Sequence, residues 1–210
     1  MVIRYNAPVV ISFAIISAVV LLINQYLLQG LVAAWFSVSA NFNPNSVRCW
    51  ITLASHVIGN TGWNQFLSNF AFILLLGPIL EESYSSWSLV VMIILTALVT
   101  AVLNILVFKT VLMGGGGVVF MMILLASFAN FTKGELPLSF ILVLLIYLGR
   151  EFLYAFDTGN INEFAHIAGG FCGSLFGFFK PGRRSSKANY KRRLMLLGSV
   201  SKAAPSKVVT

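Results

Sequence analysis

The stretch VLMGGGGVVFMMILLASFA, Val111 to Ala129, decides how the rest of the chain is interpreted. After the glycines, about twelve mostly apolar residues predict a helix that reaches only part of the hydrocarbon thickness at 1.5 Å per residue. So short a helix is expected in the centre of a bundle, with its free N–H groups below the membrane surface. The four glycines are therefore either a hinge between two membrane segments or an active-site loop lining a water-filled cavity.

The composition indicates an integral membrane protein. Of 210 residues, 58% are hydrophobic and 10% are charged, and the mean hydropathy is +0.89. An ordinary soluble domain has about 25% charged residues, so that class is excluded. Cys49 and Cys172 lie far apart without metal-type spacing, which indicates neither a disulfide framework nor a zinc site. The glycines follow no predicted strand and are not followed by a Lys and a Ser or Thr, so they do not match a phosphate-binding loop. We therefore expect no cofactor and, from the cysteine spacing, no metal.

Six apolar segments predict an all-α membrane protein built as a six-helix bundle. A span needs about 20 apolar residues, or fewer where protein shields the helix. No small-residue cleavage site follows the first segment, so we interpret it as a retained anchor. Pro78 is expected to end the second helix. The segments are 8–28, 65–80, 88–108, 117–131, 137–156 and 163–179.

Two regions are expected outside the bundle. Residues 30–62 are rich in aromatic side chains that suit a segment lying in the membrane interface on the extracytoplasmic side. From Lys180 onward the chain carries nine of its fourteen cations and no acidic residue. We interpret 1–179 as the membrane domain and 180–210 as a disordered basic tail, with both termini cytoplasmic. This placement is preferred over a nucleic-acid-binding arm.

His166 is the clearest polar residue in an apolar segment, where ionisable groups are costly and often functional. Gly169, Gly173 and Gly177 recur every four residues and predict a smooth stripe for close helix packing. The ring of His166 is expected to face the helix that packs on this stripe. From the residues alone, a functional histidine and a buried histidine bonded to a backbone carbonyl remain equally open.

A second polar cluster lies in SHVIGNTGWNQFLSN, Ser55 to Asn69. Gln65 and Asn69 are four residues apart, so their amides share one helix face. They can donate to a carbonyl oxygen in a cavity, or they can bond each other or a neighbouring helix. Glu81 and Glu82 follow at the membrane edge, where we expect them to pair with cations or backbone N–H groups and hold a loop.

The order of these motifs resembles the rhomboid family of intramembrane serine proteases. That family has six transmembrane helices, a membrane-lying first loop, HxxxN on the second helix, a Glu-containing turn, GxSG opening a short fourth helix and AHxxGxxxG on the sixth. The resemblance covers about residues 33–179. The matching residues are Asn69, Glu81, Gly114, Gly117, Val119, Phe120, Ala165, His166, Gly169 and Gly173.

The resemblance implies a serine and histidine dyad with donors for the oxyanion. By position, His166 is the retained base, while Asn69, Gln65 and Gly115 are the carbonyl-binding groups. The nucleophile position is Gly116, which has no side chain to acylate. No Ser, Cys or Thr nearby replaces it, so peptide hydrolysis by this dyad is not available to the chain.

Three hypotheses follow from this pattern. The first is a pseudoprotease that binds or escorts transmembrane segments of other proteins in a prokaryotic plasma membrane, with the lipid bilayer as its other partner and no nucleic acid. It is favoured because Asn60, Gln65 and Ser85 also depart from the family pattern. The second is an active rhomboid serine protease in its parent form, with Gly116 an engineered or erroneous substitution that inactivates it. The third is a small transporter, which predicts inverted repeats that the sequence does not show.

Overall fold

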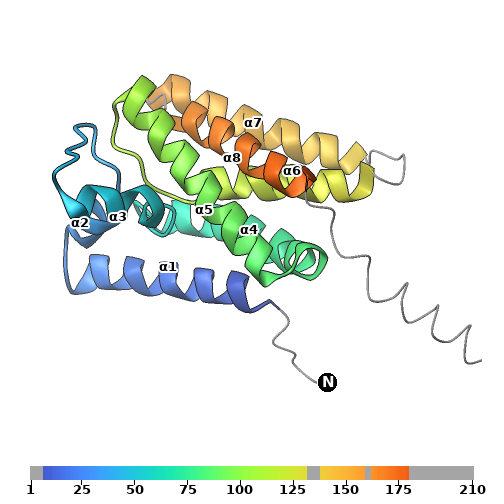
Figure 1. Cartoon of the computed structure of the whole chain (residues 1–210), viewed down its shortest axis with the longest axis horizontal. Helices are drawn as coiled ribbons and strands as arrows, with labels where there is room; N and C mark the ends of the chain where they lie inside the picture. Colours follow the sequence, from blue (N-terminus) through green and yellow to red (C-terminus); the bar gives the residue numbers. More distant parts are fainter. Residues whose placement is uncertain (1–6, 132–137, 159–161, 180–210) are drawn as a thin grey trace, which may run out of the picture.

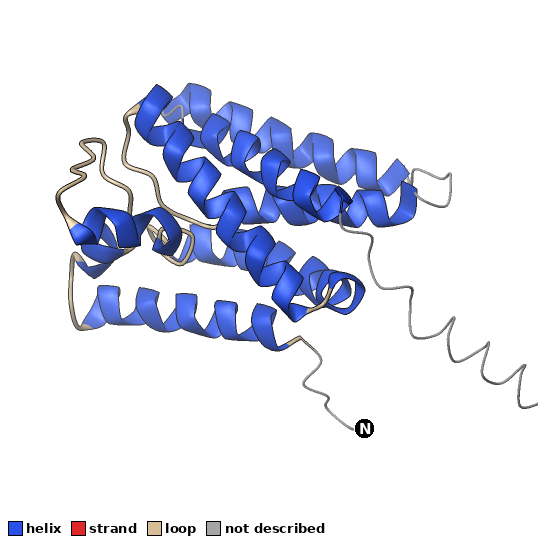
Figure 2. Ribbon diagram, in the orientation of Figure 1, coloured by secondary structure: helices blue, strands red, loops and turns tan. Residues whose placement is uncertain are grey.

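The computed structural model describes residues 7–131, 138–158 and 162–179, and these residues are almost entirely helical (Figures 1 and 2). Within them the β-type pairing is a single isolated bridge between Val38 and Leu112. The predicted all-α architecture is therefore confirmed. The helices are α1 (Pro8–Tyr26), α2 (Leu31–Trp35), α3 (Val47–Ser55), α4 (Trp63–Tyr84), α5 (Ser86–Leu103), the π-helical turn η1 (Asn104–Phe108), α6 (Gly116–Phe131), α7 (Leu138–Thr158) and α8 (Asn162–Phe179).

Each of the six predicted apolar segments contains one long helix. In the described part of the chain, three helical stretches are long and apolar enough to cross a membrane: α1, α4 and Ser86–Phe108. The apolar part of α6, Gly116–Ser127, is shorter, as the sequence predicts. The predicted tail, 180–210, lies outside the described residues.

The short helix α6 lies at the centre of the bundle. It contacts α4, α5, α7 and α8, and every side chain from Val118 to Ile123 is buried. Close packing of α8 makes this arrangement possible, because Gly169 faces Thr100 of α5 and Gly170 faces the carbonyl oxygen of Gly117. A Cβ at Gly170 would lie 2.6 Å from that oxygen, so a larger residue there would separate the helices.

The sequence predicts that helix α4 ends at Pro78, but the helix continues to Tyr84. A proline removes one backbone hydrogen bond from a helix interior, and burial of Leu80 and Glu81 in the next turn offsets that loss. The chain then turns at Ser85, whose φ of 78° lies in the left-handed region. This conformation favours glycine, so Ser85 holds a backbone geometry that a residue with a side chain rarely adopts.

A buried carboxylate joins α4 to the start of α1. The two oxygens of Glu81 accept hydrogen bonds from the N–H groups of Val9 and Val10, both at 3.1 Å. The hydroxyl of Ser86 donates to the same carboxylate at 2.6 Å. The N-terminal N–H groups of a helix have no partners within the helix, and a negative charge there is favourable. Of the two roles expected for Glu81, pairing with backbone N–H groups is the one observed.

Glu81→Ala is expected to lower the free energy of unfolding in detergent by about 2–3 kcal/mol, because hydrogen bonds to a charged group are lost and helix N–H groups are left buried. Thermal unfolding of the purified protein measures the effect. Glu82→Ala is the matched control, since Glu82 is the adjacent carboxylate and is exposed. Equal melting temperatures for the two variants would contradict this role for Glu81.

The first loop packs at one end of the long helices, where α2 and α3 lie together (Figure 1). Trp35 and Trp50 are exposed on it. The predicted placement of this loop in the membrane interface stays a prediction. Two backbone hydrogen bonds join this loop to the segment before α6: Val38 N–H to the Leu112 carbonyl at 2.8 Å, and Leu112 N–H to the Val38 carbonyl at 3.0 Å. The first loop is therefore attached to the glycine segment.

Candidate functional site

The structure brings Gly116 and His166 together. Gly116 is the first residue of α6, and His166 lies on α8. A Cβ at Gly116 would be 3.4 Å from both Cγ and Cδ2 of His166, which is ordinary van der Waals contact. A side chain at position 116 would thus lie directly against the imidazole ring.

His166 accepts a hydrogen bond at Nδ1 from the N–H of Gly117, at 3.1 Å. Only a neutral imidazole with no proton on that nitrogen can accept such a bond, so the ring proton is on Nε2. A base that removes a proton through Nε2 needs the opposite tautomer. In this arrangement His166 can donate a hydrogen bond from Nε2 and cannot accept a proton there.

The ring of His166 faces the start of α6. The glycine stripe packs on both α5 and α6, because a Cβ at Gly173 would lie 3.2 Å from the Cβ of Thr96 and from the sulfur of Met121. Gly177 belongs to α8, and its surroundings lie outside the described part of the structure.

Tyr147 of α7 is a site residue that the sequence reasoning missed. Its hydroxyl donates to the carbonyl oxygen of Gly116 at 2.7 Å, and its ring stacks on Phe120 with 5.8 Å between ring centroids. Among the described side chains of α7, Tyr147 is the one that is buried. The signal was present in ILVLLIYL, 141–148, where tyrosine is the single polar residue of an apolar run.

Gln65 closes the other side of the glycine segment. Its Nε2 donates to the Met113 carbonyl at 3.4 Å, and its Oε1 accepts from the Thr61 N–H at 2.8 Å. Gly114 has a φ of 109°, and a Cβ there would lie 2.6 Å from Nε2 of Gln65. The amide predicted to bind a substrate carbonyl is therefore bonded to the protein's own loop.

Asn69 lies one turn further along the same face of α4. Ile73, one more turn on, lies 3.5 Å from the position of a Cβ at Gly115, so this face of α4 packs on the glycine segment. Asn69 is only 3% exposed. Its side chain therefore lies within the protein, on the helix face nearest the glycines.

His56 also supports the glycine segment, through its backbone. Its carbonyl accepts the Gly114 N–H at 2.9 Å, and its ring is fully buried, which lowers the pKa of His56 to about 4. The Nδ1 atom lies 3.1 Å from the Leu53 carbonyl, which can only accept, so the proton is on Nδ1. His56 and His166 therefore carry opposite tautomers.

Comparison with known proteins assigns the chain to a family. The rhomboid domain model matches residues 47–183, which is more than half of the chain. The chain belongs to the rhomboid family. No curated protein sequence matches it. Together with the apolar helices, this rhomboid domain identifies an integral membrane protein.

In this rhomboid domain, the start of α6 and the histidine of α8 lie side by side. Gly116 stands at the position that the motif order assigns to the nucleophile. Asn60, one of the residues expected to depart from the family pattern, is buried and donates to the Ile58 carbonyl at 3.0 Å. Across the described residues, no three His, Cys, Asp or Glu side chains lie close enough to hold a metal ion.

Proposed function

We propose that this rhomboid is a pseudoprotease that binds transmembrane segments of client proteins at the glycine segment without cutting them. The observation that carries the proposal is glycine at position 116, directly beside the ring of His166. Without a hydroxyl or thiol, no acyl-enzyme can form at this position. The donors around it remain able to bind a peptide carbonyl.

Two donors are suited to an unwound client segment. The Nε2–H of His166 points away from Gly117, and Asn69 lies on the face of α4 that packs on the glycine segment. A client segment whose helix is interrupted presents carbonyl oxygens that lack intrahelical partners. Donors of this kind bind such oxygens more strongly in an apolar surrounding than in water.

The site is closed in the structure. The glycines from Gly114 to Gly117 are all buried, and Tyr147 bonds the carbonyl of Gly116. Gln65 covers Gly114 from α4. Client entry therefore requires displacement of Tyr147, and the predicted water-filled cavity stays a prediction.

Photo-crosslinking tests the proposal. A diazirine analogue of methionine at Met113, which is partly exposed beside the glycines, is expected to crosslink a single-span peptide carrying a short glycine-rich break. An all-leucine single-span peptide serves as the comparison. Tyr147→Phe is expected to raise crosslinking roughly threefold to tenfold, because it removes one net hydrogen bond that holds the site closed. Crosslinking to the all-leucine peptide alone, or to neither peptide, would sink the proposal.

Tyr84→Phe is the matched control for this prediction. Tyr84 is the last residue of α4, at the end of the helix away from Gln65 and Thr61. It should leave crosslinking unchanged, because its hydroxyl does not bond the glycine segment. Asn69→Leu should lower crosslinking several-fold, since it removes the amide while roughly keeping side-chain volume.

The orientation in the membrane is part of the proposal. The basic residues after Lys180 favour a cytoplasmic tail, and the first loop is then extracytoplasmic. A prokaryotic plasma membrane suits this orientation. Labelling of an added cysteine in the tail, in intact and in opened cells, tests it.

A further inference from the structure

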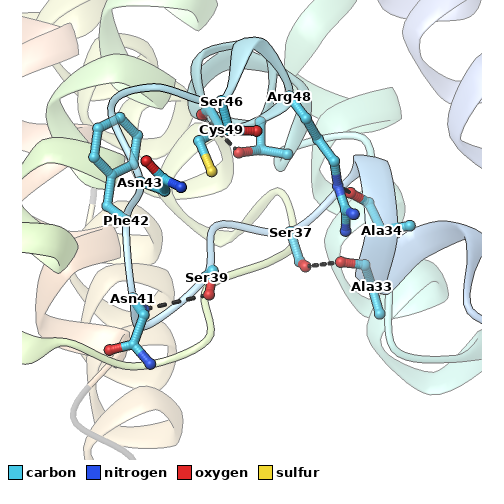
Figure 3. A pocket seen from close by; sticks show the side chains of 11 residues that line it. Ala33, Ala34, Ser37, Ser39, Asn41, Phe42, Asn43, Ser46, Arg48 and Cys49 are labelled. Atoms are coloured by element: carbon cyan, nitrogen blue, oxygen red, sulfur yellow. Dashed lines mark hydrogen bonds between the residues drawn. The ribbon is translucent and has the colours of Figure 1, made fainter.

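A polar cavity lies in the first loop, away from the glycine segment (Figure 3). Its volume is about 300 Å³, and α2, α3 and the chain between them surround it. Serine hydroxyls and asparagine amides form part of its wall, and the thiol of Cys49 reaches toward its centre (Figure 3). The lining includes Ser37, Ser39, Asn41, Asn43, Ser46 and Arg48.

Arg48 makes the cavity electropositive. It is the single charged residue between positions 30 and 62, so this segment holds no counterion for it. Its Nε donates to the carbonyl of Ala34, and its guanidinium carbon lies 5.9 Å from the centre of the Trp35 ring. These contacts fix the guanidinium. Four of its five N–H groups make no bond to another described residue.

The start of α3 adds to this charge. Ser46 precedes the helix without a side-chain cap, and both Ser46 and Arg48 line the cavity. The first N–H groups of a helix lack intrahelical partners and carry partial positive charge. An arginine fork beside such N–H groups matches the oxygens of a phosphate.

The opposite face of α3 is apolar and exposed. Val47, Trp50 and Ile51 are 74%, 57% and 47% exposed, and they lie at helical spacing on one side. Arg48, Cys49 and Thr52 lie on the other side and line the cavity. In a membrane interface, a lipid can therefore place its acyl chains on the apolar face and its headgroup in the cavity.

We propose that this cavity binds the headgroup of an anionic phospholipid with a hydroxyl-bearing headgroup, such as phosphatidylglycerol. The phosphate pairs with Arg48, and the glycerol hydroxyls bond to the asparagine and serine side chains. A choline headgroup fits poorly, because its quaternary ammonium forms no hydrogen bonds and its charge is repelled by Arg48. The site is independent of the proposed function at Gly116.

The thiol of Cys49 provides a local test. In a Cys172→Ser background, which leaves Cys49 as the single thiol, the rate of labelling by uncharged N-ethylmaleimide is measured in liposomes. Phosphatidylglycerol added to phosphatidylcholine is expected to slow labelling about fivefold. The reason is that one arginine near an anionic membrane surface strengthens binding by about this factor. Arg48→Gln should abolish the lipid dependence, whereas Arg48→Lys should keep most of it.

Three outcomes would overturn the proposal. Equal rates in both lipids exclude a headgroup in the cavity. Slowing that survives Arg48→Gln, or that appears equally at Cys172 in a Cys49→Ser protein, identifies a general surface effect. Protection by inorganic phosphate in phosphatidylcholine liposomes, equal to that by phosphatidylglycerol, assigns the cavity to a free anion.

Discussion

Gly116→Ser is expected to place a hydroxyl beside His166 and still to give no detectable cleavage of a transmembrane substrate in liposomes. The position accommodates a Cβ at 3.4 Å from the ring, so folding should be unaffected. The expected rate is about 10⁴-fold below that of an active rhomboid protease on the same substrate. The tautomer of His166 and the hydrogen bond of Gln65 to Met113 produce this loss.

The first feature is the tautomer of His166. To act as a base, Nε2 must lose its proton, and Nδ1 must gain one while facing the Gly117 N–H. Losing this bond and leaving a buried donor unpaired costs about 1–3 kcal/mol, roughly a tenfold to hundredfold loss of the competent form. The second is Gln65, whose donor is turned to Met113; loss of one oxyanion donor costs about 10²–10³ in rate.

Gly116→Ala and the parent chain are the controls, assayed beside an active family member in the same liposomes. Nitrogen-15 NMR of labelled histidine reports the tautomers directly, with assignment from His166→Gln. We expect one ring protonated on Nδ1, His56, and one on Nε2, His166. Cleavage by Gly116→Ser, but not by Gly116→Ala, would show that the dyad forms and that the chain is one substitution from a protease.

Gly169→Ala is expected to destabilise the protein by about 3 kcal/mol, because it adds a methyl group to a fully packed contact. The new Cβ would lie 2.8 Å from the Cβ of Thr100 and 3.0 Å from its Cα, so α8 or α5 must shift. A shift of α8 also moves His166. Thermal unfolding in detergent measures the loss.

Gly149→Ala on α7 is the matched control, since a Cβ there meets no atom within 4 Å. It should be neutral or stabilise the helix slightly, because alanine has the higher helix propensity. Adding Thr100→Ala to Gly169→Ala removes the hydroxyl nearest the new methyl group and should recover part of the stability. If Gly169→Ala and Gly149→Ala unfold at the same temperature, α8 does not depend on this close approach.

The long helices could be predicted from sequence because apolar segment length alone determines them. The exception at Pro78 arises because burial after the proline outweighs one missing hydrogen bond, and local sequence does not reveal burial. The proximity of Gly116 and His166 followed from motif order. The hydrogen bonding within the site could not be predicted from the sequence, since the bonds of Gln65 to Met113 and of Tyr147 to Gly116 join residues far apart in the chain.

The glycine segment is held by main-chain hydrogen bonds: two between Val38 and Leu112, and one from Gly114 to the carbonyl of His56. Main-chain donors and acceptors are the same whatever side chains the gene encodes. A change of side chain at position 116 therefore leaves these hydrogen bonds in place. The shape of this segment and the reactivity at position 116 depend on different parts of the chain, so evolution can change one without the other.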